Sequence, residues 1–350
     1  MNSLRVYWDQ VDNYPSVRKS SNIRVGMYII CIENTGKRGS QHGKVDKMKN
    51  VFCTILSKFR VYQGIALYRS LLHNAKEFRM YILCIDEDSY SICSKMNLQN
   101  AVLIREVDLG NEKLFHKRYE RELNEFCWTV KPFLVEYIFE QCAPNDYVTY
   151  VDSDICFFNN PTPIYLDHTG CDVLLSEHNY SINYRSVENV CGKYNSGFII
   201  FKNEENARHI VKWWQDRCME WCYDRTEADK FGDQKYLDFV PVIFKKVCSI
   251  ITAGVNIGPW NEAQYNYRLE GGVIHVNKDR LICYHFSGFR IVGKNSIALI
   301  GGSKNTKRML QVPYILVIKG VIEDVEKVAP NFEGFSLEER FVESASFLDI

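Results

Sequence analysis

Two carboxylates stand two positions apart, at Asp152 and Asp154, directly after the apolar run Tyr147–Val151. In an extended segment that spacing sends both side chains the same way, so one divalent cation could engage both, directly or through water. A pair of acids at the end of a buried strand is costly unless a cation or hydrogen bonds neutralise it. Asp and Ser also suit turns and helix caps, so Asp152-Ser153-Asp154 alone leaves a metal site and a turn equally open.

A histidine and a glycine follow a second apolar run. Leu281–Phe286 carries His285 near its end, and Gly288 comes shortly after it. An imidazole can complete a metal site with two carboxylates, and a glycine lets backbone N–H groups approach phosphate oxygens closely. A lone histidine after a strand is usually just a hydrogen-bonded residue, so the weight of His285 depends on the rest of the chain.

The elements that must position these residues follow an α/β pattern. Strands are predicted at Val51–Leu56, Met80–Ile85, Ala101–Val107, Tyr147–Val151, Asp172–Ser176, Gly197–Lys202 and Leu281–Phe286. Helices are predicted from Val61 through Leu72, over Lys113–Phe126, from a Thr129 cap with Pro132 in the first turn, and over Glu204–Tyr223 and Asp233–Phe239. Strands and helices that interleave through residues 50–290 predict a largely parallel sheet, whose ligands bind beyond the carboxyl ends of the strands.

Composition narrows the classes of protein. The chain has 350 residues, 46% hydrophobic, with 43 basic and 43 acidic residues, so no global field favours nucleic acid or an anionic membrane. The apolar runs Val25–Ile32 and Tyr314–Ile318 are far shorter than the roughly 20 residues of a membrane span, and the N-terminus does not resemble a signal peptide. We therefore expect a cytoplasmic protein without a transmembrane segment, with peripheral membrane contact left open.

The cysteines are scattered through the chain. Several of the 13 lie in strand-like apolar runs, where a thiol behaves as a small hydrophobe, and we expect them to be reduced. Cys218 and Cys222 share one face of a helix and could supply two metal ligands. No second pair has zinc spacing, so packing is the favoured role for them.

Six segments, in this order along the chain, together resemble a known family. They are Phe52–Lys58, Val130–Tyr137, Tyr150–Ile155, Asn195–Phe198, Asp233–Asp238 and Tyr284–Phe289. They look like nucleotide-sugar glycosyltransferases of the GT-A fold, close to the bacterial group related to the glycogenin and galactosyltransferase-like family 8. The resemblance covers residues 50–290, and six ordered segments are far more specific than the Asp-x-Asp triplet alone.

The resemblance implies a Rossmann-like GT-A α/β domain with a mostly parallel central sheet flanked by helices. We expect this catalytic domain at residues 49–295, an N-terminal extension at 1–48, and a C-terminal extension at 296–350 packed on the catalytic domain. Asp152, Asp154 and His285 would hold Mn²⁺ or Mg²⁺ against the donor diphosphate.

The resemblance also implies roles for residues around the metal. Asp233 and Gln234 would face the transferred sugar and the attacking acceptor as the catalytic pair. The implied donor-binding residues are Thr54 and Ser57 near the base and ribose, Lys131 near the phosphate or the acid pair, Asn195, Ser196 and Gly197 at the sugar, and Ser153, Gly288 and Tyr62. One departure leaves the base-stacking ring open, because this chain has Phe59-Arg60-Val61-Tyr62 where relatives often carry an aromatic after Ser-Lys.

The implied function is transfer of a sugar from a nucleotide-diphosphate donor, with UDP favoured, to a glycan or lipid-linked acceptor, with retention favoured. A nucleotidyltransferase acting on sugar phosphates is the first alternative, although Ser57-Lys-Phe-Arg is not a Gly-rich phosphate loop. A non-catalytic carbohydrate-binding protein is the second. Lys131, Asn195 and Asp233 could also be a solvated lysine, a turn residue and a helix cap.

Overall fold

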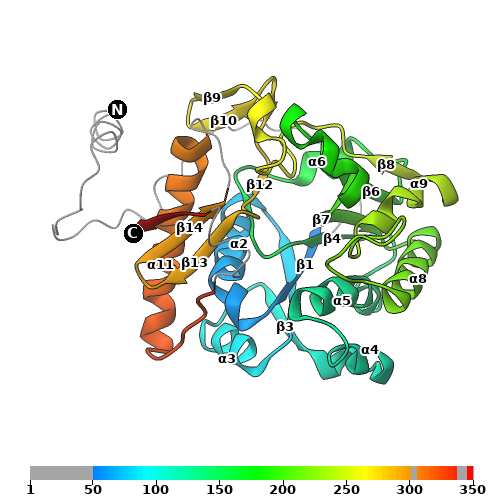
Figure 1. The fold of residues 1–350 in the computed structure, drawn as a ribbon, viewed down its shortest axis with the longest axis horizontal. Helices are drawn as coiled ribbons and strands as arrows, with labels where there is room; N and C mark the ends of the chain where they lie inside the picture. The colour runs from blue at the N-terminus through cyan, green and yellow to red at the C-terminus, as the bar shows by residue number, and fades with distance from the viewer. Residues whose placement is uncertain (1–49, 301–305, 337–344, 350) are drawn as a thin grey trace, which may run out of the picture.

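The computed structural model describes residues 50–300, 306–336 and 345–349, built around one seven-stranded sheet of order β3-β2-β1-β4-β7-β6-β8 (Figure 1). Its strands are β1 Asn50–Leu56, β2 Phe78–Cys84, β3 Ala101–Arg105, β4 Tyr147–Val151, β6 Val173–Glu177, β7 Tyr194–Lys202 and β8 Val247–Ser249. Only β7 runs antiparallel to its neighbours, so the expected α/β class with a mostly parallel central sheet is confirmed. The apolar run Val25–Ile32 and the expected extension 1–48 lie outside the described residues.

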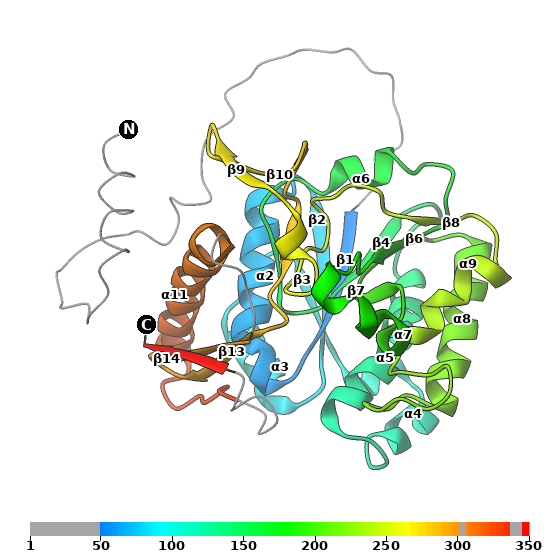
Figure 2. The same cartoon turned by 45° about the horizontal axis from the view of Figure 1, so that its top comes forward.

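Helices cover both faces of this sheet (Figure 2). One face packs against α2 Val61–Asn74, α3 Glu87–Lys95 and α6 Thr162–Leu166, and the other against α4 Glu112–Lys117, α5 Leu123–Phe139 and α8 Glu205–Glu220. Strand β1 illustrates this arrangement. Phe52 and Leu56 lie in the apolar core on the α2 side of the sheet. The alternate residues Val51, Cys53 and Ile55 lie in the core on the α5 side, as expected of a strand buried on both faces. Among the helices of the described ranges, none combines the length and apolar character that a bilayer crossing requires.

Smaller sheets and a long helix lie beside this central unit. The remaining strands are β5 Ile155–Phe157 paired with β12 Cys283–His285, then β9 Tyr267–Glu270 with β10 Val273–Val276 and β11 Asp279–Arg280, and β13 Phe289–Gly293 with β14 Ser296–Ile300 and β15 Ala345–Asp349. The remaining helical elements are η1 Lys58–Arg60, η2 Glu106–Leu109, η3 Ile182–Val187, α7 Glu188–Cys191, η4 Lys235–Asp238, α9 Val240–Ile243, η5 Glu262–Gln264, η6 Lys307–Gln311 and α11 Val312–Val328. A third apolar core joins α11 to α2 and to β12 through β14 (Figure 1).

The chain between β3 and β4 differs from the sequence prediction. The helix expected over Lys113–Phe126 is two helices, because α4 ends at Lys117 and α5 begins at Leu123. The start of α5 is set by a reciprocal cap in which the Glu122 N–H donates to the Glu125 carboxylate at 3.0 Å.

Pro132 consequently lies inside α5 and not in a first turn. The Thr129 hydroxyl donates to the Glu125 carbonyl one turn back, at 2.7 Å, and does not cap the helix. A proline in a helix interior is costly, so tertiary packing on both sides of α5 must override this local preference.

Two further predicted elements are shorter than expected. The run Leu281–Phe286 forms only the three-residue strand β12, which pairs with β5 and is not part of the central sheet. The segment Asp233–Phe239 forms a 3₁₀ helix, η4, over its middle residues. The lengths of both elements depend on contacts with distant parts of the chain, which hydrophobic periodicity alone does not predict.

The expectation that all cysteines are reduced is wrong for one pair. Cys171 and Cys248 form a disulfide between the chain entering β6 and the neighbouring strand β8. Cys218 and Cys222 are free, fully buried and packed in the core between α5 and α8, in agreement with the packing role.

Truncating the α11 side of the third core should destabilise the protein. Ile318 is fully buried there, so Ile318→Ala should lower the free energy of unfolding by about 2–5 kcal/mol through lost burial and a residual cavity. Val242→Ala, at a side chain that is 81% exposed, should change it by less than about 0.5 kcal/mol. Urea unfolding followed by tryptophan fluorescence measures both, and equal stability of the two variants would show that α11 is not part of the folded core.

Candidate metal and donor site

The acid pair lies in a tight turn at the end of β4. The Ile155 N–H donates to the Asp152 carbonyl at 3.0 Å, so Asp152, Ser153 and Asp154 turn the chain from β4 into β5. The extended geometry argued from the sequence is therefore wrong, although the two side chains still converge. Asp152 is also fixed from the next strand, because its N–H donates to the Gly197 carbonyl at 2.8 Å.

Strand pairing brings His285 to the acids. In the β5–β12 pair His285 lies opposite Ile155, one position after Asp154, and the Phe286 N–H donates to the Asp154 carbonyl at 2.8 Å. The His285 Nε2 atom is then 3.1 Å from Asp154 Oδ1 and 3.9 Å from Asp152 Oδ2. One ligand atom from each of the three residues lies within 4.8 Å of the others, so they form a compact group.

Asn256 orients the imidazole. Its Nδ2 donates to the Ser176 hydroxyl and to Asn195 Oδ1, at 2.9 and 3.0 Å, which leaves its Oδ1 facing His285 Nδ1 at 3.2 Å. The histidine therefore donates through Nδ1 and presents Nε2 to the carboxylates. A hydrogen bond of this kind behind a histidine fixes its tautomer, as in many metal sites. The backbone of Asn256 has a positive φ of 53°, which asparagine tolerates.

Gly197 leaves the space in which the three side chains meet. A Cβ atom at this position would lie 2.5 Å from His285 Cε1 and 2.7 Å from Asp152 Oδ2. Such distances are sterically forbidden, so any other residue at Gly197 would push the group apart. The glycine is needed for close approach and not for a special turn.

A buried lysine links two of the acids from the opposite side. Lys131 Nζ, on α5, lies 3.2 Å from Asp152 Oδ1 and 3.2 Å from Asp233 Oδ2, and it donates to the Ser196 hydroxyl at 3.0 Å. Tyr150 adds a hydrogen bond to Asp152 Oδ1 at 2.9 Å. Lys131 is therefore not a solvated residue in the first turn of a helix. Asp233, for which a helix cap was the alternative role, forms an ion pair with Lys131.

The ionisation of the acids reflects these neighbours. Burial is the largest influence on Asp154 and opposes its charge, but His285, Arg60 and Arg290 together hold the pKa of Asp154 below its usual value. Burial raises the pKa of Asp233 despite the opposing effect of Lys131. Burial therefore opposes the charge of both acids, and the neighbouring cations favour it.

The group has the chemistry of a divalent-cation site. The carboxylate oxygens of the two aspartates and the Nε2 atom of His285 converge, and their lone pairs repel unless a cation or proton lies between them. Oxygen and imidazole ligands suit Mn²⁺, and carboxylate oxygens suit Mg²⁺. The residues present therefore fit the Mn²⁺ or Mg²⁺ implied by the resemblance.

The proposed base and ribose residues lie at the end of β1. Thr54 and Ser57 are buried, and the Thr54 hydroxyl has no hydrogen-bond partner in the described part of the chain. Tyr62 is not brought to the site, since its ring stacks on Phe335 at 5.4 Å and is only 1% exposed. Phe59 is half-buried, and Lys58 Nζ lies over its ring at 4.9 Å from the centroid.

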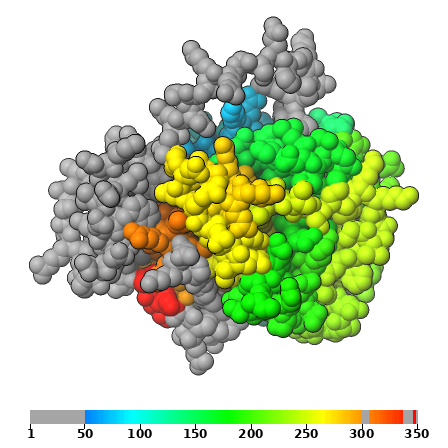
Figure 3. All heavy atoms as spheres, turned by 90° about the horizontal axis from the view of Figure 1, so that it is seen from above, coloured from blue at the N-terminus to red at the C-terminus, as the bar shows by residue number. Residues whose placement is uncertain are grey.

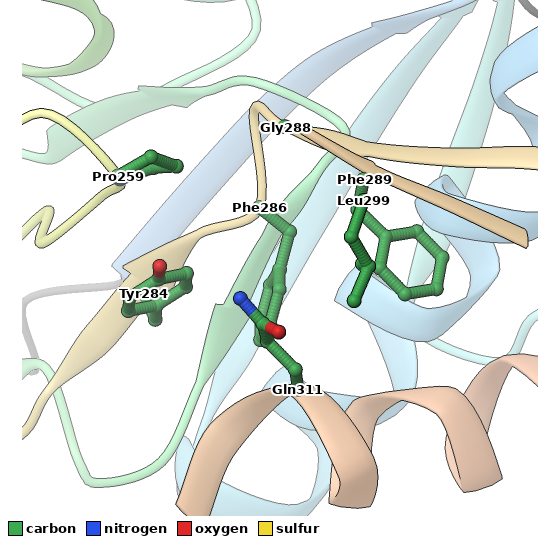
Figure 4. A pocket seen from close by; sticks show the side chains of 7 residues that line it. All are labelled: Pro259, Tyr284, Phe286, Gly288, Phe289, Leu299 and Gln311. Atoms are coloured by element: carbon green, nitrogen blue, oxygen red, sulfur yellow. The ribbon is translucent and has the colours of Figure 1, made fainter. Parts of the chain in front are cut away.

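The other predicted site residues lie in three places. Asn195 and Ser196 are buried and occupied by hydrogen bonds to Asn256 and Lys131. Ser153 is buried in the turn between the two aspartates, and Gln234 is half-buried directly after Asp233. Gly288 sits at the tip of the turn between Phe286 and Phe289, beside the narrow cavity that Tyr284 and Gln311 also line (Figure 4).

Sequence reasoning missed four side chains around the acids. Asn256 and Tyr150 hold His285 and Asp152, Arg60 lies 3.8 Å from Asp154, and the Trp260 ring packs edge-on against His285 at 5.2 Å. Only Arg60 had a possible signal, because it follows the proposed base-binding segment where an aromatic was expected.

The rim of the site combines two distant segments. The surface of β9 and β10, yellow in the space-filling view, lies next to the green surface that carries η3 and α7 (Figure 3). Asn179 Nδ2 donates to the Tyr265 hydroxyl at 3.1 Å between them, and the Ser181 N–H donates to the Trp260 carbonyl at 3.0 Å. These contacts hold Trp260 over His285.

Comparison with known proteins gives three findings. The family model described as nucleotide-diphospho-sugar transferase matches residues 78–256, which include both aspartates of the turn, Lys131 and Asp233. Two Bacillus subtilis (strain 168) proteins are similar: YfnF is 35% identical over 83% of this chain and 98% of its own length, and YfnD is 28% identical over 81% and 94%. Among solved structures, galactosyltransferase LgtC in complex with donor and acceptor sugar analogues is 16% identical with a TM-score of 0.46, covering 84% of this chain and 99% of that chain. Mouse xyloside xylosyltransferase 1 is 12% identical with a TM-score of 0.43, covering 68% and 98%.

Removing the buried lysine should destabilise the fold strongly. Lys131→Met leaves Asp152 and Asp233 facing each other without a cation, which should cost about 3–5 kcal/mol of unfolding free energy. Lys212→Met, which breaks a largely exposed pair with Asp216 on α8, should cost less than about 1 kcal/mol. Urea denaturation near neutral pH compares them, and similar losses in both would contradict the buried triad.

The stability of the protein should fall in acid partly through His178. Burial, the largest influence, lowers the pKa of this histidine to about 3, whereas an unfolded histidine titrates near about 6.5. Between these values the unfolded chain binds a proton that the folded chain excludes, so stability should fall by about 1.4 kcal/mol per pH unit as the pH drops.

His178→Gln should remove this contribution while its amide oxygen can still accept from Asn195. Unfolding free energies measured between pH 6 and pH 4 should therefore fall less steeply for the variant. Parallel curves for variant and wild type would show that His178 is protonated in the folded state.

Proposed function

Because the chain belongs to the nucleotide-diphospho-sugar transferase family, we propose that this glycosyltransferase is metal-dependent and moves a sugar from a nucleotide-diphosphate donor, UDP in the first instance. The acceptor of the proposal is a glycan or a lipid-linked glycan, and the outcome is retention at the anomeric carbon. One observation supports the metal dependence: one possible ligand atom from each of Asp152, Asp154 and His285 lies within 4.8 Å of the others.

The residues of the proposed site have different roles. Asp152, Asp154 and His285 would hold the divalent ion, which when bound supplies positive charge to stabilise the departing diphosphate. Asn256 keeps His285 Nε2 available as a ligand, and Gly197 keeps the space open. Lys131 holds Asp152 in place and compensates its charge together with that of Asp233.

The placement of Asp233 bears on the stereochemistry. An inverting enzyme needs a base that reaches the acceptor hydroxyl, whereas Asp233 is only 2% exposed and pairs with Lys131. An enclosed carboxylate is better suited to stabilise, through its own negative charge, the positive charge that develops on the sugar. Gln234, half-buried beside it, is the group we assign to the sugar and the acceptor. Both points support retention, and the anomer of the product, read by NMR, tests it.

Loss of a metal ligand should abolish donor turnover without unfolding the protein. Asp154→Ala should lower Mn²⁺-dependent release of nucleoside diphosphate from a panel of UDP-sugars by about 10²–10³-fold, because one preorganised electrostatic partner of the leaving group is lost. Asp152→Asn should act in the same direction while it preserves the shape of the side chain. Chelation of the metal by EDTA should stop the wild type reversibly.

Asp216→Asn is the matched control, since this aspartate pairs with Lys212 on the exposed surface of α8 and should keep full activity. Near-UV circular dichroism of each variant reports whether the fold survives. Wild-type turnover in Asp154→Ala, or turnover that is insensitive to EDTA, would remove the metal from the proposal.

Three further expectations from the sequence stay predictions. They are the cytoplasmic location, the division into residues 1–48, 49–295 and 296–350, and the identity of the acceptor. A thermal-shift screen of nucleotide sugars with and without Mn²⁺ tests the donor directly, because a ligand that binds the folded state raises the melting temperature.

A further inference from the structure

Arg60 is the cation nearest the solvent side of the acid group. Its Nη1 lies 3.8 Å from Asp154 Oδ2, and its side chain is 28% exposed, against 10% for Asp154 and 3% for Lys131. Arg60 is the last residue of η1 and directly precedes α2, so it lies in the connection between β1 and that helix. A ligand that approaches the acids from solvent would meet this guanidinium.

A buried glutamine holds Arg60 in this position. Arg60 Nη1 donates to Gln63 Oε1 at 2.7 Å. Gln63 is buried in the first turn of α2, and its Nε2 donates to the Phe289 carbonyl at 3.5 Å. Phe289 closes the turn that carries Gly288. Arg60 is therefore tied to the loop that follows His285 as well as to its own helix.

The other cations near the acids are already engaged. Lys131 is enclosed between Asp152 and Asp233, and Arg290 is mostly buried and donates through Nη1 to the Ser287 and Phe289 carbonyls at 2.6 and 3.1 Å. Arg60 makes a longer contact with Asp154 and keeps part of its guanidinium exposed. Guanidinium groups bind phosphate oxygens through paired N–H groups, which a lysine cannot reproduce.

The charges also balance in favour of an anion. With all three carboxyl groups ionised and His285 unprotonated, as metal binding requires, Asp152, Asp154 and Asp233 carry three negative charges. Lys131, Arg60 and Arg290 carry three positive charges, so the group is then neutral before a metal binds. A divalent ion, often the largest local charge in such a site, would leave an excess of two positive charges. The diphosphate of a nucleotide sugar carries two negative charges and would restore neutrality.

Resting on the proposed function, we propose that Arg60 is a donor-binding residue that contacts the diphosphate, turning from Asp154 toward the phosphate oxygens when the metal occupies the acids. Asp154 then exchanges its long contact with Arg60 for the metal. Gln63 is a positioning residue that keeps the guanidinium at the mouth of the site. The segment in which relatives carry an aromatic thus supplies a cation here.

Binding measurements separate this role from a structural one. Wild type, Arg60→Gln, Arg60→Lys and the control Arg69→Gln are titrated by calorimetry, first with Mn²⁺ alone and then, with Mn²⁺ present, with UDP, GDP, ADP and CDP. Arg69 lies on the same helix in an exposed pair with Asp324, away from the acids. All four proteins are folded by the same melting criterion before titration.

Arg60→Gln should weaken binding of the preferred nucleoside diphosphate by about 10–100-fold, since a charge-assisted contact is lost. Its affinity for Mn²⁺ alone should stay equal or rise, because a positive charge has been removed from beside Asp154. The diphosphate affinity of Arg60→Lys should lie between those of Arg60→Gln and the wild type, and that of Arg69→Gln should equal the wild-type affinity.

Two results would overturn the inference while leaving the proposed function intact. One is diphosphate affinity in Arg60→Gln equal to that of wild type. The other is a parallel loss of Mn²⁺ and diphosphate affinity, which would show that Arg60 only braces Asp154. If the wild type binds none of the four diphosphates in the presence of Mn²⁺, the proposed function fails first and the inference with it.

Discussion

The repulsion between acids that the fold brings together is the constraint on which the rest of this structure depends. Asp152, Asp154 and Asp233 come from two distant parts of the chain and are buried or half-buried near one another. Burying carboxylates is costly unless cations and hydrogen bonds compensate them. Lys131, inserted from α5 between two of them, is the compensation that the chain carries within its core.

Several unusual features follow from holding this group together. Pro132 is tolerated next to Lys131 inside α5. Gly197 has no side chain, which lets His285 and Asp152 approach each other. Asn256 accepts a left-handed backbone and links the histidine to β6 and β7. Each feature weakens local structure, and together they preserve one arrangement of charged atoms. Active sites commonly concentrate such compromises.

The same arrangement explains how a chain with no net charge can bind an anionic donor. Acidic and basic residues are equal in number over the whole sequence, so no long-range field gathers phosphates. In our proposal affinity arises locally, from a group of six charged side chains whose charges balance and which would become cationic only when a divalent ion enters. Metal and donor binding would be coupled through that change of charge, and this coupling would keep the site from binding other anions without the metal.

The sequence by itself determined the α/β class, the boundaries of β4 and the acids at its end, because a strand buried on both faces leaves a continuous apolar run that a polar triplet interrupts sharply. The family membership was also predictable, since the ordered segments carry it together. The sequence did not determine that Lys131 is buried in mid-helix, that β12 pairs with β5 and not with the central sheet, or that Cys171 meets Cys248. Periodicity reports which way side chains point within one element, whereas these facts depend on which elements become neighbours. Only the tertiary structure decided that, and with it how Asp154, His285 and Arg60 come to share one site.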